Sequence, residues 1–118
     1  MDGEVKEIRV MTDVRDLASV RAFYTGLLGF AERRHENIPD WIAMFELGPG
    51  RVIEFFQEEQ PKRPPVEISL EVADVRRLWE RIREQAPIAF PLRHNDWGDT
   101  SFGLTDPVGG ILVFFTPD

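Results

Sequence analysis

The chain has 118 residues, 42% of them hydrophobic and 30% charged, which is the size and composition of one globular domain. Without cysteine it has neither disulfides nor thiolate metal sites, and its net charge of −7 argues against nucleic acid as a partner. No apolar run approaches the roughly 20 residues of a membrane span and no signal pattern opens the chain, so we expect a cytoplasmic protein without a membrane partner.

The first half of the chain predicts a strand, a helix and three further strands. Residues 8–14 are rich in β-branched and apolar side chains, and Asp16 then offers a carboxylate to cap a helix. The helix ends at Gly29, a residue that suits the left-handed conformation after a helix. The apolar face of this helix consists of Leu17, Val20, Phe23, Tyr24 and Leu27. Strands are predicted after it at residues 30–35, 41–47 and 51–56, and Gly48-Pro49-Gly50 joins the last two.

The second half repeats this order 58 to 59 residues later. A strand at 66–72 precedes the helix cap Asp74, and Pro87 blocks continuation of the helix. The apolar face of this second helix consists of Val75, Leu78, Trp79 and Ile82. Strands are predicted after it at residues 89–94, 100–104 and 111–115. The proline-rich stretch 58–65 separates the halves as a linker. The sequence therefore predicts an α+β fold of two βαβββ modules in a single domain, with module one at about 5–58 and module two at about 66–118.

Two of the predicted strands are apolar on both of their alternating faces. Residues 41–45 and 111–115 both lack the polar alternation expected of a strand with one solvated face. The second face of each strand is therefore expected to meet a ligand cavity, another sheet or a partner chain.

The order of these motifs resembles the vicinal oxygen chelate superfamily, which includes glyoxalase I, bleomycin-resistance proteins, fosfomycin-resistance enzymes and extradiol dioxygenases. The resemblance rests on Val14-Arg15-Asp16, Phe23-Tyr24, Leu27-Leu28-Gly29-Phe30, Trp97-Gly98 and Asp106-Pro107-Val108-Gly109-Gly110. It spans nearly the whole chain. It implies that each module forms half of a barrel-like cup that holds the ligand, and that the chain forms a homodimer.

Metal-using members of this family place one ligand on the first and one on the last strand of each module. The resemblance assigns these positions to Arg9, Glu54, Glu67 and Val113. A guanidinium has no lone pair to donate and a valine has no polar atom. We therefore expect no metal cofactor, with a divalent metal held by Glu54 and Glu67 as the alternative.

Arg9, Glu54 and Glu67 are expected to converge in the cup. We hypothesise that they replace the metal as the electrostatic centre and meet a polar or cationic ligand group. The alternative is a structural ion network, or side chains that point to solvent.

Four further residues are candidate ligand contacts. Trp41, Phe45 and Trp97 lie outside the two helices, where aromatic faces bind flat or cationic ligands, although core or dimer packing is the alternative for each. His94 precedes the polar loop that holds Trp97, and it is interpreted as a proton-transfer or hydrogen-bonding group or as a plain surface histidine.

These features favour a metal-free small-molecule-binding protein of the bleomycin-resistance type, which sequesters an aromatic or cationic ligand. The alternatives are an atypical metal-dependent lyase, isomerase or dioxygenase of the same superfamily, and a regulatory module without a ligand. Arg9 and Val113 at the metal-ligand positions argue against enzyme activity, although the question stays open and no residue is assigned a catalytic role.

Overall fold

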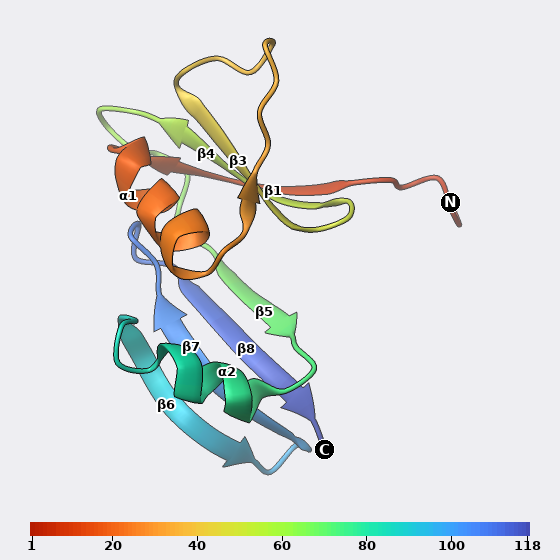
Figure 1. Ribbon diagram of the computed structural model, residues 1–118. Coiled ribbons are helices and arrows are strands. Elements are labelled where there is room, and N and C mark those ends of the chain that lie inside the picture. The colour runs from red at the N-terminus through yellow and green to blue at the C-terminus, as the bar shows by residue number, and fades with distance from the viewer. The chain divides into compact units, whose positions relative to one another are not determined.

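The computed structural model describes residues 1–118, which divide into two compact units, unit 1 (Met1–Pro64) and unit 2 (Pro65–Asp118) (Figure 1). Each unit has one four-stranded sheet with helical structure on one of its faces. The predicted α+β fold of two βαβββ repeats is confirmed. None of the helices is long and apolar enough to cross a membrane.

Unit 1 forms a sheet with the strand order β1-β4-β3-β2, in which β1 and β4 are parallel and the other neighbours antiparallel. Its elements are β1 (Ile8–Val14), α1 (Leu17–Arg21), the π-helix η1 (Ala22–Leu27), β2 (Ala31–Glu32), β3 (Ile42–Gly48) and β4 (Arg51–Gln57).

Unit 2 repeats this topology with the strand order β5-β8-β7-β6, and β5 and β8 are parallel. Its elements are β5 (Glu67–Glu71), α2 (Val75–Ile82), β6 (Ile88–Asn95), β7 (Asp99–Thr105) and β8 (Ile111–Pro117). Both helices begin where the sequence predicts, because Asp16 accepts the amide hydrogen of Ala18 at 3.0 Å and Asp74 that of Arg77 at 3.1 Å.

Two elements of unit 1 differ from the prediction. The helix after Asp16 widens from α to π geometry at Ala22, and the amide of Leu28 bonds to the carbonyl of Phe23 five residues back. The strand expected at residues 30–35 is only two residues long. One more bond, from the Arg33 amide to the Met44 carbonyl, extends its pairing before the chain turns away.

The core of each unit lies between its helix and its sheet. In unit 1 the ring of Tyr24 lies 5.3 Å from that of Phe45 and 5.2 Å from that of Phe55, and all three side chains are fully buried. In unit 2 the ring of Phe102 lies 5.2 Å from Trp79 and 5.3 Å from Phe114. These aromatic clusters fix which face of each sheet is covered.

The hairpin turns meet the same requirement with different residues. Gly50 has a φ of +70°, and a Cβ there would stand 2.5 Å from the carbonyl oxygen of Lys6. In unit 2 Gly109 has a φ of +87° in open space, whereas a Cβ on its neighbour Gly110 would stand 2.5 Å from the oxygen of Val66. In unit 1 a positive φ and a close backbone contact therefore occur at one glycine, whereas in unit 2 they occur at two different glycines.

Candidate functional site

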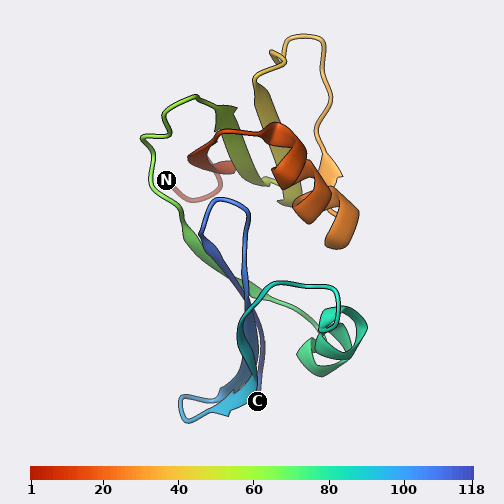
Figure 2. The same ribbon diagram turned by 90° about the vertical axis from the view of Figure 1, so that its left-hand side faces the viewer.

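Each sheet has a second face that carries no helix, here called its open face (Figure 2). Phe55 contacts Tyr24 of the helix, so Phe55 lies on the covered face. Side chains alternate along a strand, so the neighbours of Phe55 on β4 lie on the open face, and residues paired with those neighbours share that face. The open face of unit 1 consists of Arg9, Met11 and Asp13 on β1, Val52, Glu54 and Phe56 on β4, and Ile42, Met44 and Glu46 on β3.

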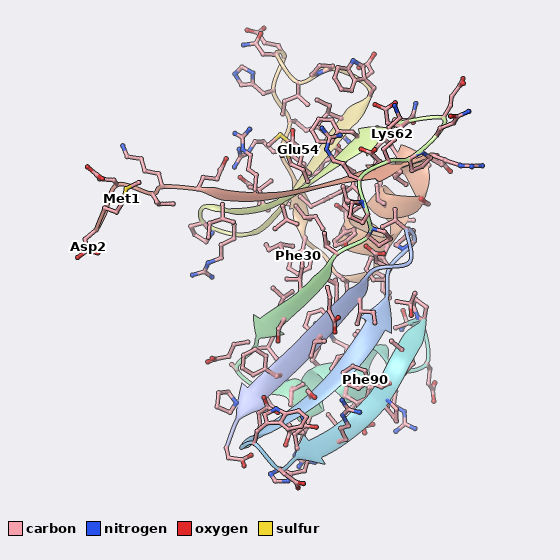
Figure 3. The ribbon with its side chains drawn as sticks, turned by 180° about the vertical axis from the view of Figure 1, so that it is seen from behind. Met1, Asp2, Phe30, Glu54, Lys62 and Phe90 are labelled. Carbon is pink, nitrogen blue, oxygen red and sulfur yellow. The ribbon has the colours of Figure 1, made fainter.

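Glu54 stands at the centre of this face, between Met11 on β1 and Met44 on β3 (Figure 3). It is 7% exposed and makes no hydrogen bond or ion pair within the chain. No buried side-chain oxygen is left without a partner, so the Glu54 carboxylate keeps contact with solvent. A carboxylate that is this buried and unpaired is costly, and a cation would relieve the cost.

An ion network borders Glu54 on one side. Arg33 binds Glu7 at 2.7 Å and Glu46 at 2.8 Å, and Arg9 binds the second oxygen of Glu7. The hydrogen bond from Arg33, joined by the one from Arg9, lowers the pKa of Glu7 from 4.5 to about 2. Arg9 is therefore held by Glu7, and neither Arg9 nor Arg33 makes an ion pair with Glu54.

An aromatic group borders Glu54 on the other side. The ring of Phe56 lies 6.2 Å from that of Trp41, and the guanidinium carbon of Arg63 lies 4.3 Å from the Phe56 centroid. Arg63 also binds the buried carboxylate of Asp13 at 2.8 Å. Burial raises the pKa of Asp13, but hydrogen bonds from Arg63 and Lys62 outweigh burial and hold the pKa below its ordinary value.

The charges of this face leave one carboxylate over. Arg9 and Arg33 balance Glu7 and Glu46, and Arg63 balances Asp13. Glu54 is the remaining charged group, so the face carries one formal negative charge in a setting of thioether and aromatic side chains.

The open face of unit 2 has a different chemistry. Val113 stands in the middle of β8, and Glu67 lies on the edge strand β5. The ring of Phe90 lies against Gly103, where it leaves no room for a side chain, and the guanidinium of Arg93 lies 4.1 Å above that ring (Figure 3). Arg93 makes no ion pair or hydrogen bond within the chain.

The structure corrects the expectation for Phe45. Its side chain is fully buried on the helix-covered face, between Tyr24 and Phe55, and so belongs to the core. Alternation alone did not reveal this, because both faces of residues 41–45 are apolar. The strand register reveals it: Phe45 pairs with Ile53, which precedes Glu54 and therefore faces the opposite side of the sheet.

His94 lies on the covered side of its sheet, and Trp97 lies in a hairpin turn. His94 pairs with Thr100, on the side of the sheet that carries α2, and its Nε2 lies 3.0 Å from a carboxylate oxygen of Asp118. Trp97 is 73% exposed in the turn between β6 and β7. Of the predicted ligand contacts in unit 1, Arg9 and Glu54 lie on the open face, and Trp41 lies beside Phe56, at the end of that face opposite to Arg9. The convergence of Glu67 with them stays a prediction.

The residues at the predicted metal positions do not fit a resident metal within either unit. The two predicted positions in unit 1 supply one carboxylate, Glu54, beside a guanidinium that is bound to Glu7. Unit 2 offers Glu67 and the apolar Val113. No group of three or more histidine, aspartate or glutamate side chains that could hold a metal ion is found.

One depression of unit 1 lies beside the loop between β2 and β3, and it has a volume of about 690 Å³. Its lining includes Arg21 and Arg34, which both bind Glu32, at 2.9 and 3.1 Å. Because its arginines already have carboxylate partners, the free charge at Glu54 marks the open face as the better candidate site.

Comparison with known proteins agrees with this architecture. Residues 9–115 match the family described as the Glyoxalase/Bleomycin resistance protein/Dioxygenase superfamily. Similar solved structures include a glyoxalase/bleomycin resistance protein/dioxygenase from Nocardioides, with 19% identity and a TM-score of 0.76 over 99% of this chain and 85% of the other.

Two further solved structures show the same likeness. TioX from Micromonospora sp. ML1 is 17% identical, with a TM-score of 0.77 over 95% of this chain and 98% of the other. A lactoylglutathione lyase from Agrobacterium tumefaciens is 15% identical, with a TM-score of 0.73 over 92% and 91%. No curated protein matches the sequence. At these identities the structural likeness concerns the fold.

Proposed function

The chain belongs to the glyoxalase/bleomycin resistance protein/dioxygenase superfamily, and within it we propose that this protein binds and sequesters a cationic small molecule without a resident metal. The proposed site is the open face of unit 1. The observation that carries the proposal is the buried carboxylate of Glu54, which has no partner in the chain although every other charged group on its face has one.

The surroundings of Glu54 indicate the kind of cation. Met11 and Met44 flank the carboxylate with polarisable thioethers that adapt to the shape of a ligand. Phe56 and Trp41 add aromatic surface beside it. A compact cationic group on a flat, largely apolar body would pair with Glu54 and cover this surface.

One alternative has an observation in its favour. Glu54 occupies the position at which the family resemblance places a metal ligand, and one structural neighbour is named a lactoylglutathione lyase. A metal-dependent lyase, isomerase or dioxygenase would use this carboxylate as a ligand. It would also have to recruit donors beyond Arg9 and Val113, which supply none.

The test compares a planar cation with its neutral analogue by isothermal titration calorimetry. p-Aminobenzamidine carries a positive amidinium, whereas p-aminobenzamide has nearly the same shape without the charge. We expect the cation to bind about tenfold or more tightly, and Glu54→Gln to remove that difference, because a hydrogen bond to a charged group contributes about 1.5–3 kcal/mol.

Glu46→Gln is the matched control, since Glu46 lies on the same face but is already bound to Arg33. Equal affinities for the two probes would count against the proposal. So would near-stoichiometric retention of zinc, nickel, iron(II) or manganese after incubation and desalting, which would favour the enzyme. Sedimentation velocity checks the homodimer, which stays a prediction.

A further inference from the structure

We propose that Asp13, Phe56 and Trp41 form a second cation subsite on unit 1, and that the chain's own Arg63 occupies it as an internal competitor. The inference rests on the proposed function for the class of ligand, a planar cation. It adds a second anchoring carboxylate and a residue that controls access to it.

Asp13 uses its two oxygens for different purposes. It is 4% exposed, and its Oδ2 accepts the backbone amide hydrogens of Lys62 at 2.8 Å and Arg63 at 3.0 Å. Its Oδ1 accepts a hydrogen bond from Nη1 of Arg63 at 2.8 Å. One oxygen therefore holds the linker backbone, and the other is available to a cation.

The Arg63 guanidinium shows how a planar cation would bind here. It lies 4.3 Å from the centroid of Phe56 and donates to Asp13, and its side chain is 44% exposed. Trp41, which is 50% exposed, lies beside Phe56. An amidinium or guanidinium group of a ligand has the same planar shape and the same donors, so it would form the same stack and the same hydrogen bond.

The linker can release the Arg63 side chain without losing its own position. The two amide bonds to Asp13 hold its backbone, and the hydroxyl of Thr12 donates to the carbonyl of Pro64 at 3.0 Å. Displacement therefore requires rotation of one long, half-exposed side chain, whose charge regains water as it leaves.

The spacing of the two carboxylates narrows the ligand class. Asp13 pairs with Phe56, which is two residues from Glu54 along β4, so the two carboxylates stand one strand and one pleat repeat apart. With about 4.8 Å between strands and about 3.3 Å per residue, the two Cα atoms are roughly 8 Å apart. With Arg63 displaced, the face carries two unpaired carboxylates. It then suits a ligand with a planar cation at one end and a second positive group at the other.

The test is the affinity of p-aminobenzamidine for Arg63→Ala. We expect binding roughly 2- to 30-fold tighter than in the wild-type chain, the range of one cation–π contact, with a shift of the Trp41 indole N–H resonance. The resonance is assigned with Trp41→Phe. The matched control is Asp13→Asn combined with Arg63→Ala, because an asparagine oxygen can still accept the two linker amides while the anionic oxygen is gone. This variant is expected to lose the gain.

Two further variants separate this inference from the proposed function. In Glu54→Gln with Arg63→Ala the indole shift persists if Asp13 anchors the cation by itself, and its loss would overturn the second subsite. In Arg63→Ala alone the dication 4-(2-aminoethyl)benzamidine gains more than p-aminobenzamidine does. Unchanged or weaker binding of both probes to Arg63→Ala, in protein whose amide spectrum stays native, would also overturn the inference, whatever Glu54→Gln does.

Discussion

The two sheets agree on their covered faces and differ on their open ones. Phe55 and Phe114 stand at equivalent core positions, as do Ile53 and Leu112, and all four are buried. On the open faces Glu54 corresponds to Val113, Met44 to Gly103, and Arg9 to Glu67. Packing against the helix constrains the covered face, whereas the open face is free to acquire different chemistry in each repeat.

The arginine–phenylalanine stacks show the same contrast. Arg63 lies over Phe56 in unit 1 and has Asp13 as its counterion. Arg93 lies over Phe90 in unit 2 and makes no ion pair. The same stacking contact therefore occurs once neutralised and once with a free charge, so the contact alone does not define a site.

The largest expected effect concerns the hairpin glycines. Gly50→Ala should destabilise the protein by about 2–4 kcal/mol, because a left-handed φ and a clash with the carbonyl of Lys6 coincide at one residue. Gly109→Ala should cost only about 1–2 kcal/mol, since open space surrounds it. Urea unfolding of both variants measures the difference, and equal losses would contradict the distinction between the two turns.

The next largest effect on the free energy of unfolding is expected when Gly103 of unit 2 is replaced by methionine, the residue type of Met44 at the equivalent position of unit 1. Gly103→Met places a side chain where the Phe90 ring lies and should cost about 1–3 kcal/mol by overpacking. Combining it with Phe90→Ala should recover part of that loss. If the two changes simply add in urea unfolding, the Phe90 ring does not limit the space above Gly103.

The converse exchange at Glu54 should separate stability from binding. Glu54→Val introduces the residue type of Val113 and removes a buried, unpaired carboxylate, so the protein should become about 1–2 kcal/mol more stable. The same variant should lose the preference for p-aminobenzamidine. Thermal unfolding and calorimetry on one preparation report both quantities, and a destabilised variant would indicate a structural role for the carboxylate.

The smallest effect is an acid sensitivity of unit 1. Because the pKa of Glu7 falls from 4.5 to about 2 on folding, its contribution is complete above pH 4.5 and is lost as the pH drops toward 2. Glu7→Gln should flatten the dependence of the unfolding free energy on pH in this window. Glu67→Gln, which removes a carboxylate without an ion pair in unit 2, is the matched control for the loss of one negative charge.

The repeat, the caps and the turns were predictable because each depends on local chemistry. Asp16 and Asp74 cap helices, and Gly50 and Gly109 have positive φ, as their residue types predict. The π-helix was not predictable in the same way, because Phe23 and Tyr24 suit either helical geometry. Tyr24 packs against Phe45 of β3 and Phe55 of β4, contacts that local sequence does not show.

The site was predictable only in part. The choice of Glu54 follows from the family resemblance and the repeat, and that of Trp41 from its place outside the two helices. The position of His94 depends on irregular pairing in β6 near Pro91, which shifts the register between Phe90 and Arg93. Asp13 was missed because its partner is the linker. The sequence did offer a signal: Asp13 is a carboxylate in a mostly apolar strand, and the linker contains the basic residues Lys62 and Arg63, which could pair with it.

The Arg63 side chain also has a consequence for how fast a ligand binds. A cation that uses Asp13 and Phe56 can bind only while the guanidinium is away, and an exposed side chain rotates in picoseconds to nanoseconds, so the exchange lowers the association rate constant by the fraction of time that Arg63 occupies the subsite. Arg63→Ala should therefore raise the association rate constant of such a ligand and leave its dissociation rate constant nearly unchanged. A monocation that uses only Glu54 has no such competitor, so stopped-flow measurements on the two proteins tell which carboxylate a given ligand uses.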